Sequence, residues 1–328
     1  MHGRHAMVLL GALWSWAGCG GDDASDVSAG LGDAGLTDAA ADALGDAGGG
    51  AGEGELLALT YNVAGLPAPL SGSMPERFMP LIGPLLNDYA LVLMQETWLT
   101  PDPNPGAPLR VYHEILVEAS EHPYQSEPAE VPWGMDASRP TALLGDGLNR
   151  FSDFPFDEVI RVPWEECVET ASDCLAFKGF SMARTTLDAS DPDHPVRVDV
   201  YNLHMEAGGS AEDDAARAAG IEQLVEFMRD ISDGRAVIVG GDFNLHTDTE
   251  PAATQFQGLL DAAELTDACE ALDCDFPGSI DKFLYRSSDE LEIRALQWSD
   301  ESDTFVSDMG EDLSDHPPIA VRFGWSVR

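Results

Sequence analysis

The sequence predicts an α/β sandwich, in which two packed sheets carry helices on their outer faces. Two observations lead to this fold class. The chain has 328 residues, of which 44% are hydrophobic, so it can bury a sizeable core. Its short apolar runs, which have the length and composition of strands, outnumber the segments with helical spacing.

The predicted strands are short runs of apolar residues. Most of them are continuous, which indicates burial, whereas the third (VRVDVYNL) alternates between apolar and polar residues. The five runs span residues 56–63, 90–94, 196–203, 236–239 and 319–323.

Two segments favour helices. Between residues 211 and 231, apolar side chains recur at helical spacing, with acidic residues and Arg on the opposite face. Residues 81–86 are expected to close a second helix before the second strand. Residues 99–164 are rich in Pro, Gly and acidic residues, and we expect long loops there, around the mouth of a site.

Residues 1–19 have the features of an export signal. Arg4 supplies a positive charge, and the apolar run 7–16 is too short to span a bilayer. The segment ends in Trp-Ala-Gly-Cys19, which resembles a bacterial lipobox, so we expect lipidation of Cys19. The alternative is an ordinary cleaved signal peptide. We therefore expect an exported protein, either an outer-membrane or cell-surface lipoprotein or a secreted or periplasmic protein.

The segment that follows, residues 20–55, contains mostly Gly, Ala, Asp, Ser and Leu and no aromatic residue. Such a composition cannot bury enough apolar surface to fold, so we expect a disordered tether. The folded domain would then occupy residues 56–328.

The four cysteines beyond Cys19 form two close pairs, Cys167 with Cys174 and Cys269 with Cys274. Because an exported protein meets an oxidising compartment, we expect two local disulfides. Zinc is the alternative, but no histidine lies at ligand spacing between these cysteines.

The charge is strongly negative. Against 59 Asp and Glu residues there are 17 Lys and Arg residues, which gives a formal net charge of −42. A chain of this kind should bind divalent cations readily, and we do not expect nucleic acid as its partner, because duplex binding depends on basic residues. An adaptation to solubility or high salt would give the same composition.

Polar residues stand at the ends of the predicted strands, where a rigid scaffold can present them to a cleft. A buried carboxylate needs a partner, and a hard cation such as Mg²⁺ prefers oxygen ligands. Each residue alone has an ordinary structural explanation, but six elements in this order favour a site. They contain Asn62, Glu96, Asn202 with His204, Asp242 with Asn244, Asp281, and Asp315 with His316.

The set TYN, QET, NLH, GGDFN, SID and SDHPP resembles the endonuclease/exonuclease/phosphatase superfamily, over residues 55–325. The resemblance implies a four-layer α/β sandwich, with two mainly antiparallel sheets flanked by helices, and one catalytic domain at 56–328. It also implies hydrolysis of a phosphoester with Mg²⁺, or another divalent cation such as Mn²⁺ or Co²⁺. We expect a monomer.

The resemblance also implies roles for single residues. Glu96 and Asn62 would hold the metal, with Asp315 at the metal or behind it. His316 would be the general base, oriented by Asp281. Two further sets complete the site. His204, Asp242 and Asn244 would act on the phosphate or on protons, and Asn202 would contact the substrate phosphate.

One element is similar to the neutral sphingomyelinase branch: Asp173 and Lys178, five residues apart and followed by Gly. They would form an ion pair or reach the phosphate. Asp146 is the expected acidic partner of His204, and Glu206 stands where that branch has Gln. These residues favour a phospholipid phosphodiester as substrate, at a membrane surface.

The alternative enzyme is a nuclease or a phosphomonoesterase that uses the same site. The alternative without catalysis is a surface lipoprotein that keeps the fold for binding. Trp98, Trp133 and Trp164 are candidates for stacking on a trimethylammonium headgroup.

Overall fold

The computed structural model describes residues 52–66, 72–100, 110–129, 142, 144–168 and 173–328. The expected export segment 1–19 with Cys19, residues 20–51 of the expected tether, and Trp133 lie outside the described residues.

The first sheet is built around β1, the predicted first strand. β1 pairs antiparallel with β14 and parallel with β2, and all other neighbours in this sheet are antiparallel. The order across the sheet is β13-β14-β1-β2-β6-β5. The strands span Glu53–Asn62 (β1), Leu91–Gln95 (β2), Tyr124–Gln125 (β5), Asn149–Ser152 (β6), Leu291–Asp300 (β13) and Ile319–Val327 (β14).

The second sheet has the same plan, with one parallel pair, β9 and β10, among antiparallel neighbours. Its order is β11-β12-β10-β9-β8-β7. The strands span Ile160–Pro163 (β7), Gly179–Asp188 (β8), Val196–His204 (β9), Val237–Asp242 (β10), Thr266–Asp267 (β11) and Asp281–Arg286 (β12). The expectation of two mainly antiparallel sheets is confirmed.

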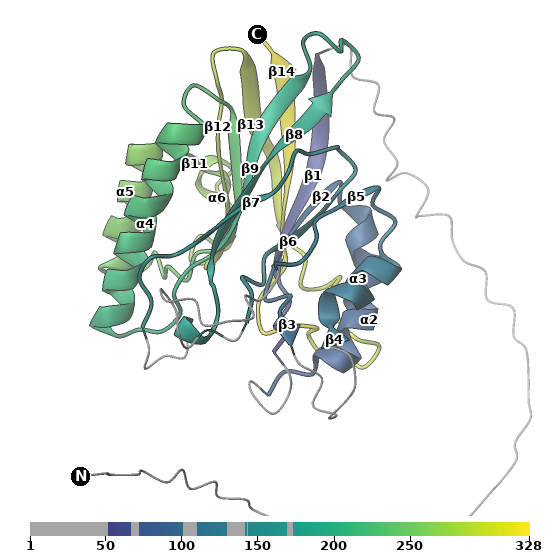
Figure 1. The fold of residues 1–328 in the computed structure, drawn as a ribbon, viewed down its shortest axis with the longest axis vertical. Helices are drawn as coiled ribbons and strands as arrows, with labels where there is room; N and C mark the ends of the chain where they lie inside the picture. The colour runs from purple at the N-terminus through teal and green to yellow at the C-terminus, as the bar shows by residue number, and fades with distance from the viewer. Residues whose placement is uncertain (1–51, 67–71, 101–109, 130–141, 143, 169–172) are drawn as a thin grey trace, which may run out of the picture. The chain divides into compact units, whose positions relative to one another are not determined.

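Helices cover the outer face of each sheet (Figure 1). On the first sheet, α2 and α3 enclose a core with β1 and β2, and on the second sheet α4 and α5 do the same with β9 and β10. A third core lies between the sheets. The helices span Pro75–Leu85 (α2), Tyr112–Ala119 (α3), Ala211–Ile231 (α4), Ala252–Ala263 (α5) and Ala268–Ala271 (α6). The result is the predicted four-layer sandwich.

Smaller elements complete the described chain. Two short 3-10 turns follow α2 and precede β8, at Leu86–Asp88 and Asp173–Leu175, and a two-stranded ribbon joins Leu99–Thr100 (β3) to Arg110–Val111 (β4). In the part of 99–164 that the structure describes, the expected loops are interrupted by regular elements, namely β3, β4, α3, β5, β6 and β7. Among the described residues, none of the helices combines the length and apolar character needed to span a bilayer.

The observed ends of several strands differ from the predicted ones because of their partners. β1 begins at Glu53, before the apolar run, because Glu53 to Glu55 pair with residues 324–326 of β14. β10 continues through Gly240 and Gly241, which have no apolar side chain but pair with both β9 and β12.

Two disulfides join Cys167 to Cys174 and Cys269 to Cys274, as predicted. The four sulfurs are therefore not zinc ligands.

Candidate active site

The inner faces of the two sheets change from apolar to polar toward one end of the sandwich. In β1, Leu56 and Ala58 belong to the core between the sheets, and the next residues on the same face are Thr60 and Asn62. Strands β2, β9 and β10 show the same change. A side-chain period of two therefore places the polar groups over the end of an apolar core.

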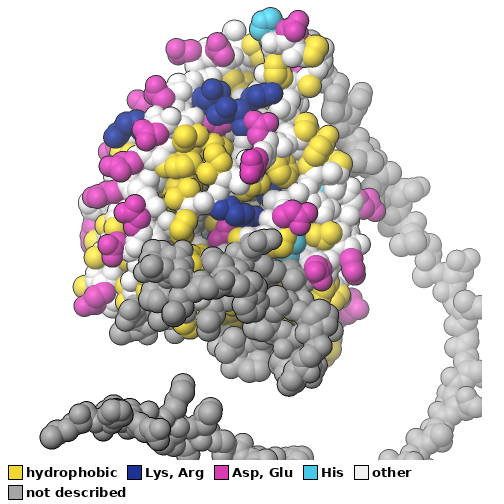
Figure 2. All heavy atoms as spheres, in the orientation of Figure 1, with side chains coloured by type: hydrophobic (Ala, Val, Ile, Leu, Met, Phe, Trp, Pro, Cys, Tyr) yellow, Lys and Arg dark blue, Asp and Glu magenta, His cyan; other side chains and the backbone are white. Residues whose placement is uncertain are grey.

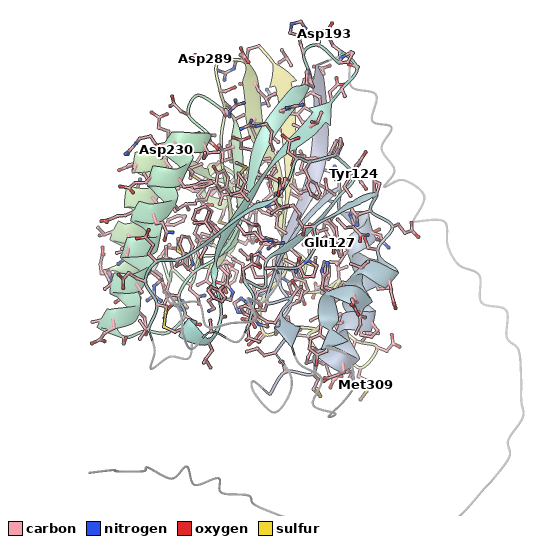
Figure 3. All side chains as sticks on the ribbon, viewed as in Figure 1. Tyr124, Glu127, Asp193, Asp230, Asp289 and Met309 are labelled. Atoms are coloured by element: carbon pink, nitrogen blue, oxygen red, sulfur yellow. A yellow bond between two sulfur atoms is a disulfide. The ribbon has the colours of Figure 1, made fainter. Side chains whose placement is uncertain are left out.

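The register of the strands brings these polar groups to one level. Asn62 pairs with Gln95 across β1 and β2, and Asp242 pairs with both His204 and Asp281 in the second sheet. This is the lower end in Figure 1. Met309 lies at this end, whereas Asp193 and Asp289 mark the opposite one (Figure 3).

Glu96 is held in the site by an unusual backbone conformation. It follows β2 with φ of 62°, a left-handed value that costs free energy for a residue with a side chain. Ala64 after β1 and Asn244 after β10 have φ of 49°, so three strand ends around the site share this conformation. The amide of Asn62 donates to Glu96 Oε1 at 3.1 Å, which fixes the carboxylate.

Asp242 lies at the centre of the site. It is almost fully buried, and its Oδ2 accepts a hydrogen bond from Asn62 Nδ2 at 3.1 Å. His204 Nε2 lies 3.3 Å from the same oxygen and 4.0 Å from Glu96 Oε1. Gly241 makes this level of the sheet possible, because a Cβ there would lie 2.2 Å from the carbonyl oxygen of Leu203.

His316 is joined to Asp281, as the sequence predicted for a base and its orienting carboxylate. Nδ1 donates to Asp281 Oδ2 at 2.8 Å, and Nε2 is 3.9 Å from Asp242 Oδ2. The imidazole is the more exposed member, with 17% of its side chain accessible, against none for Asp281. The ring is therefore fixed through Nδ1, while Nε2, which is 3.4 Å from Asn62 Nδ2, is on the partly exposed side.

The carboxylates change the protonation of the site. Burial favours the neutral form of Asp242, but the hydrogen bond and charge of His204, with the charge of His316, hold its pKa well below the ordinary value. Burial and the charge of Asp242 raise the pKa of Asp281 to about 7. Burial alone would lower the pKa of His316, but its bond to Asp281 and the surrounding carboxylates raise it to about 10.

These residues fit a divalent cation. Asp242, Asp281 and His316 offer ligand atoms within 4.8 Å of one another, and Glu96 shares the Asn62 amide with Asp242. Asp281 Oδ1 is buried and has no hydrogen-bond partner in the described part of the chain. Several carboxylate oxygens with few counter-charges suit a hard cation such as Mg²⁺.

The two other expected metal residues have different positions. Asn62 turns its Oδ1 away, to accept from the backbone N–H of Ala64 at 3.1 Å, so its amide N–H groups face the carboxylates. It therefore orients Glu96 and Asp242. Asp315 is exposed. Together with Glu96 and Asp312 it lines a groove of about 440 Å³, whose other wall is apolar and includes Phe78 and Leu313.

Asn202 is not placed to touch a substrate. It is fully buried between the sheets, donates to the carbonyl oxygens of Met94 and Asn149, and accepts from Gln95 Nε2 at 2.7 Å. The prediction of a phosphate contact is wrong, because every polar atom of this amide is used to join β9 to β2 and β6.

Asp146 does not pair with His204. Its Oδ2 accepts from Arg161 at 2.6 Å, and its Oδ1 accepts from the backbone N–H of Leu148 at 2.9 Å. The predicted pairing is replaced by the contact between His204 and Asp242. Asp146 instead shapes the turn at Gly147, which packs against the indole of Trp98.

Asp173 and Lys178 form the predicted ion pair, with Nζ 2.6 Å from Oδ1 and both side chains buried. Asp173 also accepts from the backbone N–H of Ala207, so the pair is tied to the segment that follows His204. Glu206 lies beside it. Burial and the charge of Asp173 raise the pKa of Glu206 to about 7. These contacts hold the segment that follows β9 and so help to fix His204 at the end of that strand.

Asn244 lies at the site as predicted, although it does not share a strand face with Asp242. β10 ends at Asp242, and Asp242 Oδ1 accepts from the backbone N–H of Asn244 at 2.9 Å. The side-chain amide donates to the carbonyl oxygen of Met205 at 3.2 Å.

The tryptophans have supporting contacts instead of an exposed stacking face. Trp98 is 2% exposed and donates to Glu96 Oε2 at 3.3 Å. Trp164 is 4% exposed and donates to the carbonyl oxygen of His204 at 2.7 Å. The expected stacking role is therefore not met by either residue.

Sequence reasoning also missed Ser314. Its hydroxyl donates to the carbonyl oxygen of Asn62 at 2.6 Å and accepts from the backbone N–H of His316 at 3.3 Å. This serine therefore joins the loop of His316 to the end of β1. A serine two residues before another residue often binds that residue's backbone N–H. This spacing in the sequence could have predicted the contact between Ser314 and His316.

Comparisons with known proteins agree with this fold. No model of a protein family matches the sequence. The sphingomyelinases of Mycobacterium bovis and Mycobacterium tuberculosis are 34% identical to it over 294 residues, which cover 82% of this chain and 53% of each relative. The chain thus spans about half the length of the curated relatives it matches.

Solved structures share the sandwich. Sphingomyelinase C from Streptomyces griseocarneus has a TM-score of 0.57 at 19% identity, over 82% of this chain and 99% of that one. A beta toxin variant from Staphylococcus aureus with bound magnesium ions has a TM-score of 0.56 at 18% identity, over 81% of this chain and 99% of that one.

Proposed function

Since the chain belongs to the endonuclease/exonuclease/phosphatase superfamily as a homologue of sphingomyelinases, we propose that it is a metal-dependent phosphodiesterase acting on a phospholipid. The observation that carries this proposal is the pair of His316 and Asp281. The Nε2 of His316 lies 3.9 Å from Asp242 Oδ2, the oxygen that His204 Nε2 also approaches, at 3.3 Å. Two imidazoles near one buried carboxylate oxygen suit proton transfer to and from a phosphoester.

In the proposed reaction, His316 Nε2 removes a proton from water, which attacks the phosphorus. Asp281 keeps Nδ1 protonated and stabilises the imidazolium that forms. Asp242 stays ionised because its pKa is held low. Its charge can therefore stabilise the protonated form of His204, whose Nε2 lies 3.3 Å from Asp242 Oδ2. As the bond from phosphorus to the departing oxygen breaks, His204 would turn its Nε2 proton from Asp242 to that oxygen.

Glu96, Asp242 and Asp281 would hold the cation, with Asn62 and Trp98 orienting Glu96. A bound Mg²⁺ would neutralise the phosphate and the developing charge on the leaving oxygen. The carboxylates also hold a proton on His316, and a divalent positive charge among them would favour its release.

A phospholipid substrate is supported by the names of the curated relatives and by the charge of the chain. A net charge of −42 opposes a polyanion such as DNA more strongly than a zwitterionic lipid. We also propose that residues 1–19 direct export and that Cys19 carries a lipid. Mass spectrometry of the mature protein tests this, since an unmodified N-terminus that begins at or after Cys19 would contradict the lipid.

The proposed activity is tested by a substrate panel of sphingomyelin, phosphatidylcholine, plasmid DNA and a simple aryl phosphodiester, each with Mg²⁺ or with a chelator. We expect release of phosphocholine from sphingomyelin, with Mg²⁺ required. Glu96→Gln should lower kcat/KM by about 10²- to 10³-fold. The matched control is Glu226→Gln, on the exposed face of α4. If hydrolysis persisted with the chelator and in Glu96→Gln, the proposed site would not be the active site. If DNA were the one compound hydrolysed, the protein would be a nuclease and the phospholipid assignment would be wrong.

A further inference from the structure

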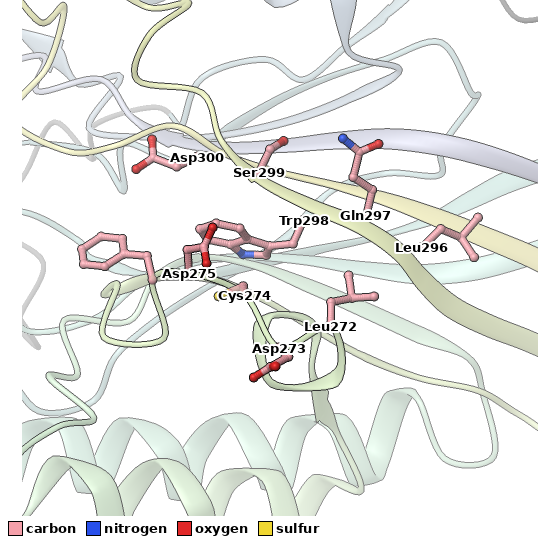
Figure 4. Close-up of a pocket in the computed structure, with 10 residues that line it drawn as sticks. Leu272, Asp273, Cys274, Asp275, Leu296, Gln297, Trp298, Ser299 and Asp300 are labelled. Atoms are coloured by element: carbon pink, nitrogen blue, oxygen red, sulfur yellow. The ribbon is translucent and has the colours of Figure 1, made fainter.

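A second groove lies at the open edge of the sandwich, between the edge strand β13 and the loop that follows α6 (Figure 4). Its volume is about 570 Å³, larger than that of the groove beside Glu96. The disulfide between Cys269 and Cys274 closes the loop on one side. The lining residues are Leu272, Asp273, Cys274, Asp275, Phe276, Leu296, Gln297, Trp298, Ser299 and Asp300.

Two aromatic side chains belong to this groove. Trp298 is half-buried, packs against the core between the sheets, and points from β13 toward the loop. Phe276 is 45% exposed, an unusual state for a phenylalanine. A bulge in β13 after Ala295 leaves Leu296 unpaired, so the strand bends where the groove begins.

The charges of the groove have one sign. Asp273, Asp275 and Asp300 all line it, and its lining contains no Lys or Arg. Each of the three aspartates is exposed. A cation would therefore meet carboxylates without a competing basic side chain.

The carboxylates are not arranged for a metal ion. Within the described residues, the group of acids and histidines whose ligand atoms lie within 4.8 Å of one another is that of Asp242, Asp281 and His316. The three aspartates of the groove form no such group, so their carboxylates are more widely spaced. Such spacing suits a bulky cation, whose charge is spread over several ångströms.

We propose that this groove binds a quaternary ammonium group. The rings of Trp298 and Phe276 would contact its methyl groups through cation–π attraction, and the carboxylates of Asp275 and Asp300 would lie around it. Free choline and the choline headgroup of a bilayer lipid share this chemistry. Asp300 pairs with Ile319, three residues after His316, so the groove opens at the same end of the sandwich as the catalytic site. The proposal does not depend on the proposed catalytic activity.

Calorimetric titration of the full chain with choline tests the groove. Choline has no phosphoester bond, so the titration measures binding apart from catalysis. We expect the double variant Asp275→Asn with Asp300→Asn, and separately Phe276→Ala, to weaken choline binding at least about fivefold. Asp193→Asn, at the opposite end of the molecule, is the matched control and should bind as the parent does. Equal binding by parent and variants would overturn the proposal, as would a site that takes Mg²⁺ or Ca²⁺ and excludes choline.

Sedimentation with vesicles separates the two sources of the ligand. Binding to phosphatidylcholine vesicles, but not to phosphatidylglycerol vesicles, that is lost in the double variant would assign the groove to a lipid headgroup. Choline binding without vesicle binding would support the same chemistry with a soluble ligand. Vesicle binding that the variants leave unchanged would place the membrane contact elsewhere and overturn the lipid assignment.

Discussion

His316 is surrounded by acids, and this determines when it can act as a base. Asp281 bonds to its Nδ1, and Asp242 and Asp315 add negative charge. These groups stabilise the imidazolium and raise the pKa to about 10. A base can accept a proton from water only in its neutral form, so the reaction rate should rise with pH as His316 loses its proton.

Asp281→Asn should therefore have two effects. Removing the carboxylate removes the main stabiliser of the imidazolium, so the pKa of His316 falls and the rising limb of the pH–rate profile moves to lower pH. Because an amide can present its NH2 group as well as its oxygen to the ring, the tautomer with a proton on Nδ1 is no longer fixed, and kcat should fall by about 10²- to 10⁴-fold. The measurement is kcat and kcat/KM against pH, at a Mg²⁺ concentration shown to saturate the variant itself, because Asp281 is also a proposed ligand of the cation. A limb that stays in place would show that another group is the base.

Asn202 shows how a site motif can contain a structural residue. The sequence places it two positions before His204, on the same face of β9. That alternation is correct, but the face is continuous with the core, and the amide is enclosed before the strand reaches the cleft. How deeply each position of a strand is buried depends on the sheet that packs against it. The sequence of β9 alone therefore could not show that Asn202 is enclosed.

We expect Asn202→Ala to destabilise the protein by about 2–4 kcal/mol, because it leaves Gln95 and two carbonyl oxygens buried without their partner. KM for the substrate should not change.

Asn244→Gly is the contrasting variant. It removes a side chain at the site, tolerates φ of 49°, and should lower kcat/KM with little effect on stability. Urea denaturation and kinetics of both variants measure this. A raised KM in Asn202→Ala would instead support the prediction that Asn202 contacts the substrate phosphate.

At the scale of elements, prediction succeeded where one segment contained the whole signal. The helix at 211–231 has the predicted bounds because its apolar stripe and its cap are both local. β8 and β13 were missed. β13 is an edge strand with much of its length exposed, and β8 carries Ser, Thr and Arg among its apolar residues. Both are strands because of their neighbours, so no apolar run marked them.

The start of α4 gives a prediction for a single element. Ser210 accepts from the backbone N–H of Asp213, and Asp213 Oδ2 accepts from the backbone N–H of Ser210, which forms a capping box. Ser210→Ala should lower the free energy of unfolding by about 1 kcal/mol and Tm by roughly 2–4 °C. Ser210→Thr keeps the hydroxyl and should retain most of the stability. Equal Tm values for Ala and the parent in calorimetry would show that the cap contributes nothing.

For the whole molecule, the motifs predicted the four-layer sandwich and most of the residues of the site. The ordered strand-end residues Glu96, Asp242, Asp281 and His316 do meet, because they lie beside strand ends of both sheets that reach one level. The partner of His204 was predicted wrongly, since Asp146 and Asp242 are both acids in suitable motifs and only the packing of the turn at Gly147 distinguishes them.

The overall charge gives the last prediction. On the face shown in Figure 2, acidic side chains are spread over the described residues, whereas Lys and Arg occupy few places. Inside, Asp281 and Glu206 both have pKa values raised to about 7, so the folded protein binds protons more tightly than the unfolded chain. Their contribution to stability is fully present below the ordinary carboxyl pKa and is lost as pH rises through about 7. Self-repulsion of the surface acts in the same direction.

The metal-free protein should therefore lose stability between about pH 4 and pH 7 and regain it with salt. We expect Tm at pH 8 to rise on the order of 5 °C between about 0.05 and 1 M NaCl, because screening weakens the repulsion. Millimolar Mg²⁺ should add a further increase through the site, and this second part alone should disappear in Glu96→Gln. Differential scanning calorimetry across pH and salt separates the two effects. If Glu96→Gln kept the whole Mg²⁺ effect, the ion would act on the acidic surface and not at the site between the strand ends.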